Sequence, residues 1–291
     1  MLGLGNSITS GSVASGFSPI NIDALVGWWD FTDISTLWRD GGSTAVESDG
    51  QNVARIDNKA YTLQGNTATA IGTFLQSSLV DSTKNPVYKT GGQNGYSYGQ
   101  FDGSNDYLLA SKVVGNVSTD RLSNSTLNGS LMTVFFVVKS DVTSVTGDMH
   151  LFQMQGADTS DNFQLYIDNN SSTDRWEWDT QDNTGRTHTL MNCGQNITNV
   201  AEYWTVELDS TSSSSFYRNG DTSDGVTNGN ADNFNVDLSV DNANVAMILG
   251  GKTNSTNNFD GNIHEIIIYD AALSDDQISK VEGYLSDKYG L

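Results

Sequence analysis

The sequence predicts an all-β protein, a two-sheet antiparallel sandwich of the jelly-roll type with one short C-terminal helix. Three observations lead to this fold class. Short runs rich in β-branched and aromatic residues recur along most of the chain. Turn residues separate these runs, and apolar residues at convincing helical spacing occur only near the C-terminus. At 291 residues the chain can bury a large core without disulfides or metal ions.

The first element is an arm over residues 1–22, and one folded domain is expected over residues 23–291. The arm is rich in Gly and Ser and lacks sustained periodicity, so we predict that it is extended or flexible. Its apolar residues are too few to fold alone but sufficient to anchor the arm if another chain supplies grooves. These arm residues are Leu2, Leu4, Ile8, Val13 and Phe17.

Eight segments are predicted strands, and turn chemistry separates them. Asn94-Gly95 and Asn219-Gly220 are favoured hairpin turns, because both residues tolerate positive φ. Apolar side chains occur on both faces of the strand predicted over residues 264–269, which places this strand inside a sheet that is covered on both faces. The predicted strand segments read ALVGWWDF, LMTVFFVV, FQLYID, RWEWD, YWTVELD, FYRNGD, VAMILGG and HEIIIYD.

The last element is a helix whose start, apolar face and end are all visible in the sequence. Ser274 and Gln277 form a capping-box pattern, and Ile278, Val281 and Leu285 recur at helical intervals. The helix is therefore predicted to pack one apolar stripe against the sandwich.

Charge and composition exclude several kinds of partner. The net charge is −21, and the 14 basic residues are scattered, so neither a nucleic-acid groove nor an anionic membrane surface is expected as a partner. No apolar run is long enough for a transmembrane helix, and no Sec signal is recognised at the N-terminus. Cys193 is the only cysteine, so no intramolecular disulfide forms, and the chain fits a reducing cytoplasm.

Four stretches together resemble the LamG-like, concanavalin A-like family of lectins and glucanases, of the type found in bacteriophage virion proteins. They read ALVGWWDFTDISTL, YGQFDGSNDYLLA, YWTVELDSTSSSSFYRNGD, and ILGG leading into FDGNIHEIIIYDAALSDDQISKVEGYLSDKYGL. The resemblance implies two curved antiparallel sheets, a last strand that returns beside the first, and a final helix that covers a sheet edge. It fixes no single function, because the family includes sugar-binding modules, adhesion domains, hydrolases and virion proteins.

The segment RWEWDTQD is the nearest approach to a catalytic motif. Hydrolases of this fold carry Glu-x-Asp-x-Glu on one strand, whereas Gln181 stands here at the third carboxylate position after Glu177 and Asp179. We therefore expect no catalytic residues and no enzymatic activity. If the indoles of this strand face the core, Glu177 and Asp179 face the solvent. Together with Tyr166 they are the candidate glycan-binding residues.

No cofactor and no metal site are expected. The histidines lack ligand spacing for zinc. Calcium is considered because oxygen-bearing side chains occupy alternating positions at Asp168, Asn170, Ser172 and Asp174. Asp179 is the twelfth residue counted from Asp168, as in an EF-hand loop. However, Thr173 replaces the turn glycine of such a loop.

These observations favour a non-enzymatic bacteriophage virion protein, a capsid decoration or tail appendage that binds host or environmental glycans. The start, MLGLGNS, is also similar to the starts of some marine phage structural proteins. Such a protein would assemble in the host cytoplasm, contact other virion proteins through its arm and form a homo-oligomer. The alternatives are a secreted bacterial carbohydrate-binding adhesin and a glycoside hydrolase with a degenerate site.

Overall fold

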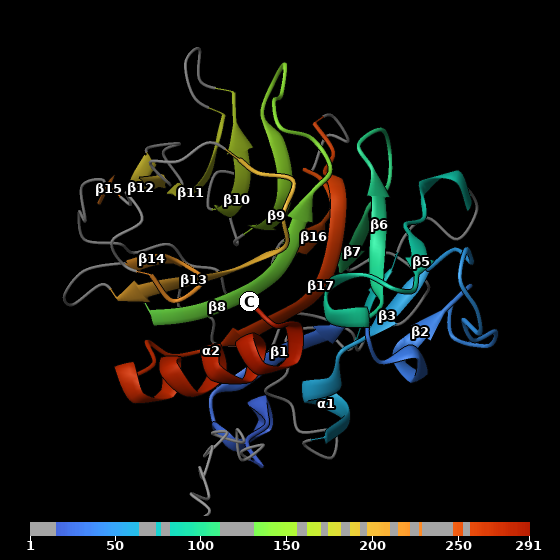
Figure 1. The fold of residues 1–291 in the computed structure, drawn as a ribbon, viewed down its shortest axis with the longest axis horizontal. Helices are drawn as coiled ribbons and strands as arrows, with labels where there is room; N and C mark the ends of the chain where they lie inside the picture. The colour runs from blue at the N-terminus through green and yellow to red at the C-terminus, as the bar shows by residue number, and fades with distance from the viewer. Residues whose placement is uncertain are drawn as a thin grey trace, which may run out of the picture.

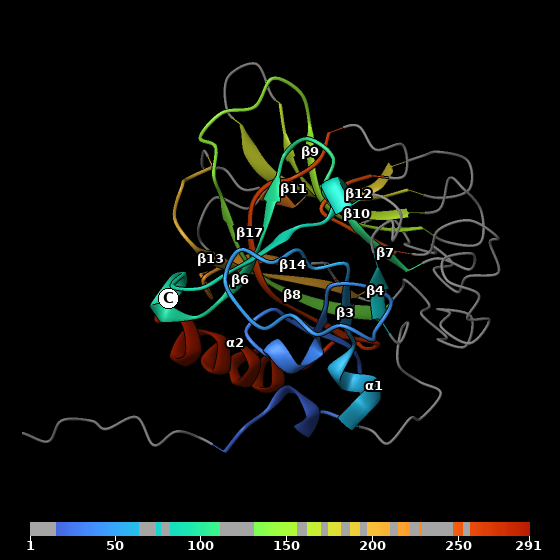
Figure 2. The same cartoon turned by 90° about the vertical axis from the view of Figure 1, so that its right-hand side faces the viewer.

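A computed structural model describes residues 16–63, 74–76, 82–110, 131–155, 162–169, 174–181, 187–192, 197–209, 215–221, 227–228, 247–252 and 257–291. Within these residues the strands form two antiparallel sheets of seven and ten strands, here called sheet A and sheet B. A long helix lies on the side of sheet A that faces away from sheet B (Figures 1 and 2). The predicted all-β sandwich is confirmed.

Sheet A has the order β14-β13-β8-β17-β6-β5, and β1 pairs with the C-terminal half of β17. Its strands are β1 (Leu25–Asp30), β5 (Val87–Lys89), β6 (Tyr98–Asp102), β8 (Leu131–Ser140), β13 (Glu202–Asp209), β14 (Ser215–Arg218) and β17 (Asp260–Tyr269).

Sheet B has the order β15-β12-β11-β10-β9-β16-β7-β4-β3-β2. Its strands are β2 (Leu37–Trp38), β3 (Arg55–Asp57), β4 (Phe74–Gln76), β7 (Leu108–Ala110), β9 (Met149–Gln155), β10 (Asn162–Asp168), β11 (Arg175–Gln181), β12 (Thr187–Asn192), β15 (Thr227–Asn228) and β16 (Met247–Leu249). The two helices are α1 (Lys59–Leu63) and α2 (Asp275–Tyr289).

The main core lies between the two sheets, and aromatic side chains from both sheets meet there. Trp176 of sheet B lies against Trp204 of sheet A, with ring centroids 6.1 Å apart. Phe136 of sheet A lies against Phe152 of sheet B at 5.3 Å. Burying large aromatic groups from both sheets ties the sheets into one unit.

β17 lies in the interior of sheet A, as predicted. It pairs with β8 along one side and with β6 and then β1 along the other. Ile266 and Ile268 face the main core, while Ile267 and Tyr269 face α2. The last strand thus returns beside the first, as the family resemblance implied.

A bulge in β17 between Ile263 and Glu265 changes which face its residues use. The ring of His264 lies 5.3 Å from the ring of Tyr289 in α2, and Glu265 accepts a hydrogen bond from the Tyr289 hydroxyl at 2.7 Å. Two consecutive polar residues of one strand therefore face the helix.

Helix α2 begins and ends where the sequence predicts. Ser274 is its N-cap, with the backbone N–H of Ser274 donating to the Gln277 side chain at 3.0 Å, and Gly290 ends it at φ +67°. The helix covers a face of sheet A, where it packs on Phe135 and Tyr269, so the expectation that it covers an edge is wrong. An apolar stripe has to be buried, and the outer face of sheet A offers more apolar area than an edge does.

Candidate functional site

The two tryptophans of β11 face the main core, as expected, and this decides the orientation of the residues between them. Trp176 and Trp178 are fully buried with sheet A side chains. Because side chains alternate along a strand, Glu177 and Asp179 face the other side of sheet B. The expectation that these acids lie exposed to solvent is wrong, since Glu177 is only 5% and Asp179 only 4% exposed. Alternation along a strand predicts which face of the sheet a side chain points to. It does not predict whether other parts of the chain cover that face.

Six polar side chains form two rows across β9, β10 and β11, on the face of sheet B that points away from the core. We call this set the polar face. Tyr166 in the middle strand pairs in register with His150 and Glu177, and Gln164 pairs with Gln153 and Asp179. A register shift beside Tyr166 places His150 opposite it. The six residues are His150, Gln153, Gln164, Tyr166, Glu177 and Asp179.

The row that contains Tyr166 has close contacts. The Tyr166 ring stacks on the His150 ring with centroids 5.0 Å apart and an angle of 23° between the planes. The Tyr166 hydroxyl donates to Glu177 Oε1 at 2.6 Å, and Arg175 Nη2 lies 3.6 Å from Glu177 Oε2. The predicted residues Tyr166 and Glu177 are thus brought together, and Asp179 lies in the adjacent row.

Burial controls protonation on the polar face. Burial and the nearby Lys252 together lower the pKa of His150 to about 4, so the imidazole is neutral at pH 7. Burial also raises the pKa of Tyr166, as do Asp179 and Glu177. The pKa of Glu177 is raised, chiefly by burial.

Some buried polar atoms here have no hydrogen-bond partner among the residues that the structure describes. They are both ring nitrogens of His150, Gln164 Oε1 and Arg175 Nε. A buried polar atom without a partner costs about 1–3 kcal/mol, so such atoms commonly mark the place of a bound molecule or water. The polar face therefore holds donors and acceptors that the described part of the chain leaves unpaired.

Sequence reasoning identified only half of the polar face. Gln164 was visible in principle, because it alternates with Tyr166 in FQLYID. His150 and Gln153 are three residues apart, which contradicts simple alternation, and only the register shift in β9 puts both on one face. A bulge of this kind leaves no recognisable sequence signal.

The loop considered for calcium does not gather its oxygens around one point in the described part of the chain. Asp174 Oδ2 accepts the backbone N–H of Val145 at 2.8 Å, and Asp179 lies opposite Gln164 within the sheet. Asn170 and Ser172 lie outside the described residues. No group of three or more His, Cys, Asp or Glu side chains within the described ranges can hold a metal ion.

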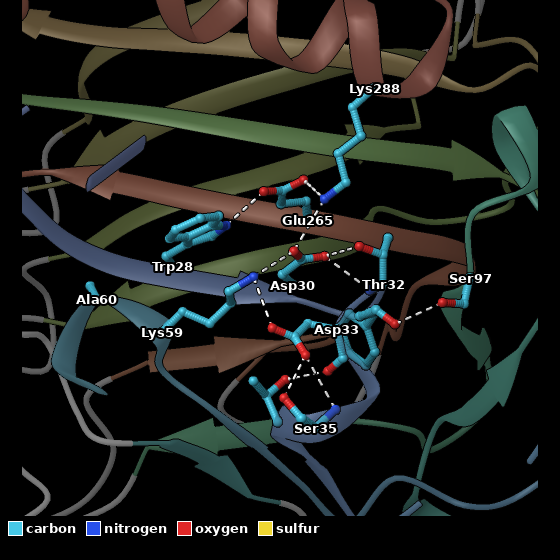
Figure 3. Close-up of polar contacts among 12 residues, drawn as sticks. Trp28, Asp30, Thr32, Asp33, Ser35, Lys59, Ala60, Ser97, Glu265 and Lys288 are labelled. Carbon is cyan, nitrogen blue, oxygen red and sulfur yellow. Dashed lines mark hydrogen bonds and ion pairs between the residues drawn. The ribbon is translucent and has the colours of Figure 1, made fainter. Parts of the chain in front are cut away.

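A second polar cluster lies beneath α2 and is built from ion pairs (Figure 3). Lys288 Nζ lies 2.8 Å from Glu265 Oε2 and 3.1 Å from Asp30 Oδ2, and Lys59 Nζ lies 3.0 Å from the same Asp30 oxygen. Glu265 also accepts the Trp28 indole N–H at 2.6 Å. These contacts fix both helices to sheet A, and Glu265 is fully buried, so the cluster is structural.

Of the five predicted arm residues, only Phe17 is described. It is half-buried against the apolar residues that pack between α2 and sheet A. The chain next to it is also held, because the Tyr269 hydroxyl donates to the Pro19 carbonyl at 3.0 Å. Leu2, Leu4, Ile8 and Val13 lie outside the described residues.

Among the described residues, no helix has the length and apolar content that a membrane-spanning helix requires.

Comparison with known proteins gives a family match and several structural likenesses. The sequence profile described as the concanavalin A-like lectin/glucanases superfamily matches residues 102–279. The CBM40 module of Ruminococcus gnavus IT-sialidase, bound to α2,3-sialyllactose, is 18% identical with a TM-score of 0.41, over 53% of this chain and 82% of that chain. The sequence finds no match among curated proteins.

Two larger proteins show the same level of likeness. The NanB sialidase of Streptococcus pneumoniae, as its K499G mutant, is 18% identical with a TM-score of 0.45, over 62% of this chain and 27% of that chain. The binding domain of botulinum neurotoxin serotype D is 14% identical with a TM-score of 0.48, over 80% of this chain and 51% of that chain. The present chain thus spans about half or less of these two chains, and the likeness concerns the fold alone.

Proposed function

The chain belongs to the concanavalin A-like lectin/glucanase superfamily, and from this premise we propose that it binds glycans on the polar face without cleaving them. One observation carries the proposal. Two rows of hydrogen-bonding side chains cross three strands, and His150 in one of them has no hydrogen-bond partner at either ring nitrogen among the described residues.

A glycan matches the chemistry of this face. Each sugar hydroxyl both donates and accepts, so one hydroxyl can serve an imidazole N–H and another the acceptor nitrogen of the same ring. Gln164 Oε1 is a further acceptor, and Arg175 Nε is a donor. An apolar ligand would leave all these atoms unpaired, which costs free energy at each one.

The same residues favour binding over hydrolysis. A glycosidase needs one carboxyl group as acid and a second as base or nucleophile. Glu177 is already engaged by the Tyr166 hydroxyl and lies beside Arg175. Gln181, at the third position of the strand motif, can neither donate a proton as an acid nor attack as a nucleophile.

Glycan-array screening of the full chain, followed by calorimetric titration of the best ligand, tests the proposal. Tyr166→Phe removes one hydroxyl from the polar face, and we expect affinity to fall about tenfold, the loss of one good hydrogen bond. Tyr217→Phe is the matched control, because it removes the same group from β14 of the other sheet. Equal affinities for the two variants, or no glycan bound on the array, would overturn the proposal.

Hydrolysis is tested on the same protein with β-glucans, agarose and alginate, and no reducing sugar should be released. Release that Glu177→Gln abolishes would show that the carboxylate is catalytic and that binding is only part of the activity.

The role as a virion structural protein rests on sequence features and stays a prediction, as do the homo-oligomer and the location in a particle. The segment that would carry it, residues 1–20, is mostly outside the described residues. Deletion of residues 1–15, which keeps the packed Phe17 and Pro19, should abolish incorporation into particles and leave the β circular dichroism unchanged. Full incorporation of the truncated protein would refute the role of the arm.

A further inference from the structure

A polar hollow of about 620 Å³ lies at one end of the sandwich, beside the polar face. Three loop segments surround it: the turn between β6 and β7, the loop between β8 and β9, and the residues that lead into β17. The lining includes three carboxylates and one buried amide, which are Asp102, Asp148, Asp260 and Asn258. We call this space the rim hollow.

Two of its carboxylates are forced together by strand pairing. Asp102 and Asp260 are direct partners in the β6–β17 ladder, where side chains of opposed residues lie about 4.5–5.5 Å apart at Cβ. Gly103 brings the β6–β7 turn close to Asp260, because a Cβ on this glycine would lie 2.7 Å from the Asp260 Cβ. Like charges opposed in this way are destabilising unless a cation lies near them.

Burial and nearby carboxylates both raise the pKa of two acids at this edge of the sandwich, Asp260 and Asp106. Burial, Asp141 and Asp102 raise the pKa of Asp260. Burial and Asp102 raise the pKa of neighbouring Asp106 to about 7. A positively charged group in the rim hollow would relieve the repulsion and favour the ionised acids.

Asn258 gives an independent indication of a ligand. Asn258 is one of the lining residues and is only 3% exposed, yet neither its amide nitrogen nor its amide oxygen has a hydrogen-bond partner in the described part of the chain. A buried amide with both ends unpaired calls for a ligand that offers both a donor and an acceptor.

The rim hollow lies next to the polar face. The backbone N–H of His150 donates to the Asn257 carbonyl at 2.8 Å, and His150 forms a bridge with Asn258. Asp148 in the lining is close enough to Asp168 of β10 to raise the pKa of that residue. The rim hollow and the polar face therefore adjoin in the fold.

We propose that the rim hollow is the subsite for a free ammonium group on the glycan, so that the protein selects amino sugars that are not acetylated. The inference rests on the proposed glycan binding. An ammonium group has three donors for the carboxylates and for Asn258 Oδ1, and a neighbouring sugar hydroxyl accepts from Asn258 Nδ2. A bare metal ion fits less well, because no three acidic or histidine side chains in the described ranges converge on one point.

Binding is measured by calorimetry on the full chain with three β-1,4-linked tetrasaccharides that differ only at C2. They carry ammonium (glucosamine), acetamide (N-acetylglucosamine) or hydroxyl (glucose). The glucosamine tetramer should bind about tenfold or more tightly than the other two, an advantage of at least about 1.4 kcal/mol. Glucosamine alone, compared with glucose by ligand-observed nuclear magnetic resonance, tests the subsite without reference to any linkage.

Two variants separate the subsite from general attraction to an acidic protein. Asp260→Asn should remove the preference for glucosamine, whereas Asp276→Asn, which removes one charge from an exposed position of α2, should keep it. Asn258→Leu should also weaken glucosamine binding.

Each further outcome has a distinct meaning. Binding of all three tetramers with equal affinity overturns the ammonium subsite and leaves glycan binding intact. No binding of glucosamine up to about 50 mM, weaker than ordinary specific recognition, overturns the subsite whichever glycans bind the polar face.

A preference that Asp260→Asn and Asp276→Asn reduce equally reflects net charge and also overturns the ammonium subsite. Calcium that binds at micromolar concentration in the wild type but not in Asp260→Asn would assign the hollow to a metal ion.

Discussion

His264 is buried in sheet A and is held in its neutral form. Its Nδ1 lies 2.9 Å from the Ser97 carbonyl, to which it donates, and its ring lies against Tyr98 and Tyr289. Burial lowers the pKa of His264 to about 4. A buried histidine with a lowered pKa makes the folded protein less stable as the pH falls.

The sign of this dependence follows from proton binding. Between pH 6.5 and pH 4 the unfolded chain protonates this histidine and the folded chain does not, so acid favours unfolding. The stability that depends on neutral His264 is complete above about pH 6.5 and is lost as the pH falls to about 4, a loss of about 3 kcal/mol.

His264→Gln keeps a donor for Ser97 and removes the titration, so its free energy of unfolding should change less between pH 7 and pH 4 than that of the wild type. Urea unfolding at several pH values measures the difference. Parallel curves for the two proteins would show that His264 already titrates normally in the fold.

At the scale of single residues, the sequence predicts side-chain direction better than exposure. Trp176 and Trp178 were placed in the core correctly, because the hydrophobic effect chooses indoles over carboxylates. Glu177 was placed on the right face but with the wrong exposure. The position of His150 depends on the register shift between β9 and β10, which no local pattern encodes.

Among the elements, α2 is held at its C-terminal end by three segments, β1, β17 and the turn between β5 and β6. Lys288 reaches inward to Glu265 and Asp30. The turn between β5 and β6 also closes the helix, because Gln93 Nε2 donates to the Tyr289 carbonyl and Asn94 Nδ2 to the Lys288 carbonyl, both at 2.8 Å. These bonds satisfy carbonyl groups that the end of a helix leaves without partners.

Lys288→Met should lower the free energy of unfolding by about 3–5 kcal/mol, because it leaves Glu265 buried without a cation and leaves Asp30 with Lys59 alone. Lys280→Met on the same helix is the control. Lys280 pairs only with exposed Asp276, so its loss should cost about 0.5 kcal/mol or less. Guanidinium unfolding of both variants measures this difference. Similar losses would show that the buried ion pairs of Lys288 contribute no more to the free energy of unfolding than the exposed pair of Lys280.

The sequence predicted the limits of α2 and not its position. A capping box and a C-terminal glycine are local signals, and both are confirmed. The docking surface is formed by β1, β8, β13 and β17, which are separated by long stretches of chain. The partner of Lys288 was equally hidden, because Asp30 lies 258 positions away.

On the scale of the whole molecule, the two sheets share one apolar core, so neither can keep its structure alone. Trp176 and Trp204 meet across it, and the main core includes residues from both sheets. We therefore expect one cooperative unfolding transition.

Tryptophan fluorescence, which reports on the packing between the sheets, and far-ultraviolet circular dichroism, which reports on the strands, should give the same urea midpoint. Trp204→Phe should lower both midpoints together. Two separate midpoints would mean that one sheet survives after the contact between the sheets is lost.

The position of β17 also determines when the fold can form during synthesis. β1, β6 and β8 are all made before their common neighbour, so the ribosome must extend the chain through Tyr269 before sheet A can close. Until then β8 has an open edge on the side that β17 will occupy, and open edges invite pairing with other chains. Contacts between distant parts of a chain also form slowly. The interval between the synthesis of β8 and the arrival of β17 is therefore when the nascent chain is most exposed to aggregation and most dependent on chaperones.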